Sequence, residues 1–146
     1  MAESDDWKER HKFVSTALGA DLAFQERFAI YLPNMGFRQP DGSQRIISDW
    51  GTVWIPEALD LLGDINGGAT AMAIAEGYWI DEDHRNAKVW ERTCVVYAFL
   101  RREKFKSSIH RVREFAHRFG RETGQGAVFF EYDDFAYSIP APFDML

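Results

Sequence analysis

Residues 69–101 read "ATAMAIAEGYWIDEDHRNAKVWERTCVVYAFLR", and this stretch decides the fold. Its first part, 69–80, alternates between two sets of side chains with the two-residue period of a β-strand. The polar segment 81–88 predicts a hairpin loop, and 89–101 predicts the returning strand. Because the returning strand is apolar on both of its faces, we expect it to lie in the middle of a sheet.

The flanking segments add further strands and helices. The run ending at Pro33 predicts a strand. Ser48 is expected to cap a helix over 49–64 with an apolar stripe, kinked or split near Ile55 because Pro56 removes a backbone donor. A third helix is expected after Ser107 or Ser108, ending at Gly120. The segment 127–139, "AVFFEYDDFAYSI", predicts a last strand, or a strand and a short hairpin.

An additional helix is expected at 4–18, before this core. Trp7, Val14 and Leu18 recur on one of its faces, and this stripe has to pack against something, with the open side of the sheet as one candidate. Glycines 67 and 68 follow the second helix, and we expect Gly68 to adopt a left-handed conformation at the turn into the next strand.

Without the first helix, the order of elements is strand, helix, strand, strand, helix, strand. This order predicts an α+β fold of the ferredoxin-like βαββαβ type, an antiparallel sheet backed on one face by two helices. Another α+β layer arrangement and an incomplete barrel are the alternatives. We expect one domain over 1–146, with the helix at 4–18, the ferredoxin-like core at 24–139 and a tail at 140–146.

Several short motifs carry a resemblance to a known family. They are "PDG" at 40–42, "SDW" at 48–50, "GGAT" at 67–70, "GYW" at 77–79 and "RFGRETGQGAVFFEYD" at 118–133. From Phe28 to about Ile139 the chain resembles small bacterial ferredoxin-like domains of unknown function. The export signal that such domains often carry is absent here. Because that family has no settled activity, the resemblance implies the fold and lends no catalytic residue.

The composition predicts a folded domain in the cytoplasm. The chain has 146 residues, 46% of them hydrophobic and 15% aromatic, which excludes a disordered chain. No apolar run approaches the roughly 18–20 residues of a membrane span. The opening "MAESDDWKER" is not a signal peptide, and the single Cys94 cannot form an internal disulfide.

The charges are distributed unevenly. The net charge is −6, yet basic residues dominate 101–121, whereas acidic residues dominate 41–91. The stripe of the third helix predicts an outward-facing set that could bind a partner, made of Arg111, Arg113, His117 and Arg118. The acidic region could meet this face within the chain or across a dimer, or an external acidic protein or nucleic acid could bind there.

No motif completes a catalytic, cofactor or metal site. Gly67 and Gly68 follow a helix, whereas a phosphate-binding loop precedes one. His110, Glu114 and His117 share a helix face, but the neighbouring arginines oppose a metal ion. The acids at 81–83 are expected to form a solvated hairpin tip rather than a cation site. We therefore predict no catalytic residue, no cofactor and no metal.

The two-sided apolar sheet favours a function in binding. Two helices cover only one face, yet the strands at 72–80, 93–100 and 127–132 are apolar on both, so Trp79 and Tyr97 are partner-binding candidates. The main prediction is a non-enzymatic cytoplasmic protein-interaction module, a homodimer or an accessory subunit. The alternative is a small-molecule enzyme of the dimeric ferredoxin-like barrel type, in which the second sheet face lines a cavity. A nucleic-acid-binding module using the basic helix 101–121 is the second alternative, disfavoured because the third strand lacks the aromatic pattern of RNA-recognition motifs.

Overall fold

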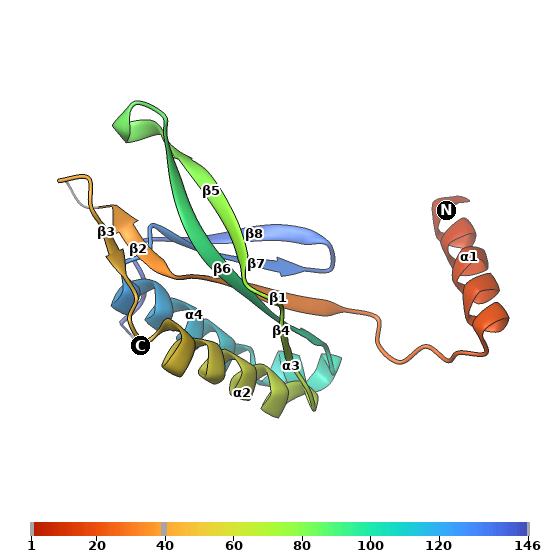
Figure 1. Cartoon of the computed structure of the whole chain (residues 1–146). Helices are drawn as coiled ribbons and strands as arrows, with labels where there is room; N and C mark the ends of the chain where they lie inside the picture. Colours follow the sequence, from red (N-terminus) through yellow and green to blue (C-terminus); the bar gives the residue numbers. More distant parts are fainter. Residues whose placement is uncertain (1, 39–40, 146) are drawn as a thin grey trace.

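The computed structural model describes residues 2–38 and 41–145, and its main sheet is antiparallel (Figure 1). The strands of this sheet are β1 (Arg27–Pro33), β4 (Thr70–Ala71), β5 (Ala75–Asp81), β6 (Ala87–Phe99), β7 (Ala127–Tyr132) and β8 (Phe135–Pro140). Their order is β4-β6-β1-β7-β8, and β5 also pairs with β6. Helices α2 (Ile55–Asn66) and α4 (Ile109–Thr123) lie together on one side of it (Figure 1). The predicted α+β class, an antiparallel sheet with helices, is confirmed.

The core lies between β1, β6 and the two helices. Ile30 and Leu32 of β1 are buried and pair in register with Val96 and Cys94 of β6. Phe119 of α4 packs against them from the helix layer. The side chains of alternate strand residues therefore point to the opposite face, away from the helices.

The predicted split of the second helix near Ile55 is confirmed. A π-helical turn over Trp50–Trp54 leads directly into α2, and Pro56, which has no backbone N–H to donate, occupies the first turn of α2.

One predicted boundary is wrong around the basic segment, and one helix was not predicted. Helix α4 begins at Ile109, directly after Ser108, as expected, but a separate short helix α3 (Arg102–Ser107) precedes it. Helix α4 also runs through Gly120 and ends at Gly124, which has a φ of 71° and caps the helix. The expected loop after β1 contains a small hairpin of β2 (Met35–Arg38) and β3 (Gln44–Ile46). Its strands were too short and too rich in turn residues to be predicted.

The N-terminal helix α1 (Ala2–Leu18) stands apart from the sheet (Figure 1). Its helical conformation was predicted, but the expected burial of its apolar stripe is wrong for this chain. Trp7, Val14 and Leu18 remain between 45% and 76% exposed. Among the described residues, none of the helices combines the length and hydrophobicity that crossing a membrane requires.

The turn after α2 depends on Gly67 rather than on Gly68. Gly67 has a φ of 84° and its N–H bonds to the Gly63 carbonyl at 2.7 Å, whereas Gly68 has an ordinary φ. We expect Gly67→Val to lower the free energy of unfolding by about 1–2 kcal/mol, because a β-branched residue resists positive φ. Gly68→Val is the control, since a side chain there meets open space. Urea unfolding that gives equal losses for the two variants would contradict this assignment.

Candidate functional site

A groove lies on the sheet face that the helices leave uncovered, and we call it the outer groove. Its volume is about 510 Å³, within the range of sites for small molecules. Strands β1, β5, β6 and β7 all contribute to it, together with the turn before β7. The side chains that give it chemical character are Tyr31, Trp79, Glu91, Thr93, Phe129 and Glu131.

Glu91 is the most unusual group of the outer groove. It lies opposite Gly77 in the β5–β6 register, and it is half-buried. Burial raises the pKa of this carboxyl to about 7, and a hydrogen bond from the Trp79 side chain opposes the rise. A carboxyl with this pKa exchanges its proton near neutral pH, which is the property that general acid–base catalysis requires.

Glu131 differs from Glu91 because it has compensating partners. The Tyr31 hydroxyl donates a hydrogen bond to Glu131 Oε1 at 2.8 Å, and Arg27 Nη2 lies 3.6 Å from Glu131 Oε2. Burial, and then Glu131, raise the pKa of Tyr31. The groove therefore contains one carboxylate that is already paired and one, Glu91, for which no cation contributes to the pKa.

This arrangement favours a cationic ligand with a flat apolar part. Aromatic side chains attract cations over their ring faces, and Trp79 and Phe129 supply such rings. A positive charge beside Glu91 would also favour its ionised form. Anions are disfavoured in the same place, because two carboxylates line the groove.

The predicted partner-binding arginines are engaged within the chain. Arg111 Nη1 lies 3.0 Å from Asp64 of α2, and Arg118 Nη2 lies 2.6 Å from Glu57 of α2. The contact between the acidic region and the basic helix is thus present inside one chain. Arg113 instead pairs with Asp144 of the C-terminal tail.

Of the other predicted residues, His117 lies on the helix side of the sheet, and Trp79 and Tyr97 lie on the uncovered side. His117 was expected to point outward, but it is buried against the tail. Trp79 lines the outer groove, and Tyr97 lies on the same sheet face with the Arg27 guanidinium 5.4 Å from its ring centroid. Glu91 was not predicted. Its one signal in the sequence is the charged pair Glu91-Arg92 within a strand that is mostly apolar.

The remaining candidates have structural explanations. His84 Nδ1 lies 2.8 Å from Asp81 within the hairpin tip, and Cys94 is buried, which raises the pKa of its thiol. In the described ranges 2–38 and 41–145, no three His, Cys, Asp or Glu side chains are grouped as a metal site would require.

Comparisons with known proteins find similarity in structure alone. No family model matches the chain, so the resemblance to small bacterial domains stays a prediction. No curated protein matches it either. A phage SAM lyase in its apo state is 13% identical with a TM-score of 0.53, over 85% of this chain and 96% of that one. A phage SAM lyase in complex with S-methyl-5'-thioadenosine is 16% identical with a TM-score of 0.49, over 80% and 89% of the two chains.

These matches correct the main functional prediction. The sequence favoured a non-enzymatic protein-interaction module, but the apo phage SAM lyase, whose fold this chain shares with a TM-score of 0.53, is an enzyme. That finding contradicts the module and agrees better with the alternative, a small-molecule enzyme. The self-association expected with the module stays a prediction.

Proposed function

We propose that this protein is an enzyme acting on a small sulfonium compound of the S-adenosyl-L-methionine (SAM) type, bound in the outer groove. The observation that carries the proposal is Glu91, a half-buried carboxyl with a pKa of about 7 in an aromatic groove. The likeness of the fold to the apo phage SAM lyase supports the choice of substrate class.

The strand order β5-β6-β1-β7, with α2 and α4 as crossovers, supports a ferredoxin-like core for this enzyme.

The groove suits the sulfonium and the adenine of such a substrate. A sulfonium carries a permanent positive charge, which Glu91 and the ring faces of Trp79 and Phe129 would stabilise. An adenine ring is flat and stacks readily on aromatic side chains. The polar groups of Thr93 and Gln125, which also line the groove, offer hydrogen bonds that would orient the ligand.

The carbon–sulfur bond of a sulfonium can be cleaved by elimination, for which the protein has to supply a base. In an elimination, the electron pair of that bond stays on sulfur, which leaves as a neutral thioether. A proton leaves the carbon chain at the same time, and the electron pair of that C–H bond forms the new carbon–carbon double bond. Ionised Glu91 would accept the proton, a role that typically contributes about 10²–10⁴-fold in rate.

The test is direct incubation of the purified protein with SAM, with detection of S-methyl-5'-thioadenosine by liquid chromatography. Glu91→Gln should lower kcat at least about 100-fold, because it removes the base while keeping the shape of the side chain. Glu76→Gln is the matched control, since Glu76 is an exposed acid of β5 whose ion-pair partner, Arg92, lies at 3.6 Å. We expect it to retain full activity.

Binding gives a second readout of the same proposal. Protons and the cationic substrate compete for Glu91, so the Kd of SAM should rise as the pH falls below about 7 and level off above it. The neutral thioether should show no such dependence. Absence of both turnover and calorimetrically detected SAM binding at pH 8 would refute the proposal.

A further inference from the structure

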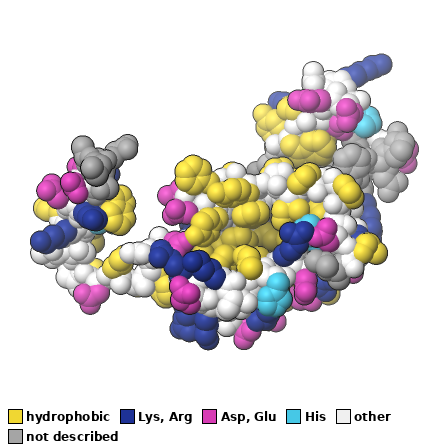
Figure 2. Space-filling view, turned by 180° about the vertical axis from the view of Figure 1, so that it is seen from behind, with side chains coloured by type: hydrophobic (Ala, Val, Ile, Leu, Met, Phe, Trp, Pro, Cys, Tyr) yellow, Lys and Arg dark blue, Asp and Glu magenta, His cyan; other side chains and the backbone are white. Residues whose placement is uncertain are grey.

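A second groove lies on the opposite side of the sheet, and we call it the inner groove. It runs between α4 and the β7–β8 hairpin and has a volume of about 630 Å³. Figure 2 shows hydrophobic side chains gathered in a hollow on this side of the molecule, with charged and histidine side chains at its border. The side chains that form its apolar wall include Phe28, Ile109, Val112, Phe130, Tyr137 and Ile139.

The apolar wall is ordered by ring contacts and open to solvent. Tyr137 stacks on Phe130 with 5.1 Å between the ring centroids, and Phe28 lies 5.4 Å from the same ring. Ile109 and Tyr137 are nevertheless exposed. An exposed apolar surface of this kind is characteristic of a binding site.

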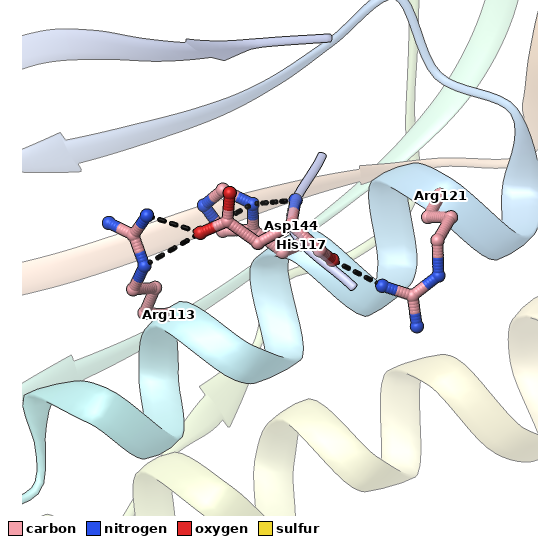
Figure 3. Close-up of polar contacts among 4 residues, drawn as sticks. All are labelled: Arg113, His117, Arg121 and Asp144. Atoms are coloured by element: carbon pink, nitrogen blue, oxygen red, sulfur yellow. Dashed lines mark hydrogen bonds and ion pairs between the residues drawn. The ribbon is translucent and has the colours of Figure 1, made fainter. Parts of the chain in front are cut away.

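One end of the inner groove is polar and cationic. Arg113 and His117 both line it, one turn apart on α4. The backbone N–H of Asp144 donates to His117 Nδ1 at 2.9 Å, so a neutral imidazole carries its proton on Nε2 (Figure 3). The groove thus combines an apolar wall with a guanidinium and an imidazole N–H donor.

A carboxylate of the chain itself already occupies this cationic end. Asp144 Oδ2 accepts hydrogen bonds from Arg113 Nε, at 3.1 Å, and from Arg113 Nη2 (Figure 3). Both guanidinium N–H groups thus converge on one carboxylate oxygen, and charge-assisted hydrogen bonds of this kind are strong. Both side chains are partly exposed, and exposed ion pairs contribute little net stability. The Asp144 carboxylate can therefore be exchanged for another at small cost.

The rest of the tail does not depend on that carboxylate. Arg121 donates to the Asp144 backbone carbonyl, and Phe143 packs against Gly120 and edge-on to His117. Rotation of the Asp144 side chain away from Arg113 would leave these contacts in place.

We propose that the inner groove binds an amphipathic carboxylate, such as a medium-chain fatty acid, with its carboxylate on Arg113 in place of Asp144. The apolar chain of the ligand would lie along Phe130, Tyr137 and Ile109. The Asp144 carboxylate, which pairs with Arg113, indicates the charge and the position of the head group. This site is separated from the outer groove by the sheet, and the inference does not rest on the proposed enzyme activity.

Calorimetric titration with decanoate, below its micelle concentration, tests the proposal. We expect one site per chain, and decyltrimethylammonium, which has the same chain length and the opposite charge, should bind at least tenfold more weakly. Arg113→Gln should weaken decanoate binding at least tenfold. Arg111→Gln, a neighbour on α4 that pairs with Asp64, is the matched control and should bind as the wild type does.

The variant Asp144→Asn tests whether Arg113 binds the ligand or only holds the tail in place. Removing the internal carboxylate frees Arg113, so decanoate should bind several-fold more tightly to this variant. Equal binding of both amphiphiles, or no gain in the Asp144→Asn variant, would overturn the proposal. Glu91→Gln should leave decanoate binding unchanged. A negative result for SAM in the outer groove therefore does not affect the test of carboxylate binding in the inner groove, and the reverse also holds.

Discussion

Glu91→Gln is expected to raise the free energy of unfolding at pH 8 and to leave it almost unchanged at pH 4. The pKa of Glu91 is about 7 in the folded protein, against an ordinary value of 4.5. Between these two values the folded state binds more protons than the unfolded state, so the carboxyl lowers stability progressively as the pH rises. At pH 4 both states are protonated and the penalty vanishes.

The size of the effect follows from the same two values. A difference of this size corresponds to at most about 3 kcal/mol, and partial exposure of Glu91 reduces it, so we expect a gain of about 1–3 kcal/mol at pH 8. Gln can still accept the hydrogen bond from Trp79, which keeps the packing intact. The measurement is urea unfolding at both pH values, with Glu76→Gln as the exposed control. A loss of stability at pH 8, or the same change at both pH values, would contradict the burial of this charge.

Stability gained by removing a catalytic group is a recognised trade-off in enzymes. Structural carboxyls usually have low pKa values because cations and N–H donors stabilise their charge. Glu91 has the opposite arrangement, since burial dominates over its one hydrogen bond. A destabilising carboxyl in an open groove is better explained by function than by folding.

The sequence predicted the central hairpin well because its signal is local. Alternation along β5 and a long apolar run along β6 identify two neighbouring strands without reference to the rest of the chain. The short β2–β3 hairpin could not be predicted in this way. Its strands pair through only a few residues, Met35 with Ile46 and Arg38 with Gln44, and turn residues are frequent in the sequence between them.

The candidate site was harder to predict because it is built from distant segments. Tyr31 and Glu131 are 100 residues apart in the chain, and they meet only because β1 pairs with β7. Glu91 belongs to no catalytic motif, and its properties come from burial by neighbours on other strands. Trp79 was selected because it lies on the second sheet face, and it does line the outer groove there. Its assignment to a protein partner stays a prediction.

The individual contacts of the basic helix α4 with distant segments were also not predicted from the sequence. Its apolar stripe correctly placed Val112, Phe115 and Phe119 in the core. The partners of its arginines depend on how α4 packs against α2 and the tail, which no periodicity encodes. His117 was misplaced for this reason, because the tail segment around Phe143 covers a helix face that would otherwise be exposed.

Phe119→Ala is expected to cost about 3–5 kcal/mol, the largest loss of stability among single substitutions considered for this protein. Phe119 is 0% exposed, and its ring meets the Trp54 ring edge-on with 5.2 Å between the centroids. Truncation leaves a cavity between α4 and the sheet that the surrounding rings cannot fill. Because domains of this size are stable by only about 5–15 kcal/mol, the variant should unfold at a much lower urea concentration.

Phe129→Ala is the matched comparison on the other face of the sheet. Phe129 is 54% exposed on the wall of the outer groove, so its loss should cost under about 1 kcal/mol. The effects on SAM binding should be the reverse of the effects on stability. Phe129→Ala removes an aromatic wall and should weaken SAM binding, whereas Phe119→Ala should bind normally under conditions where it remains folded. Similar stability losses for the two variants would show that the outer face is covered in solution, since only a buried ring is costly to remove.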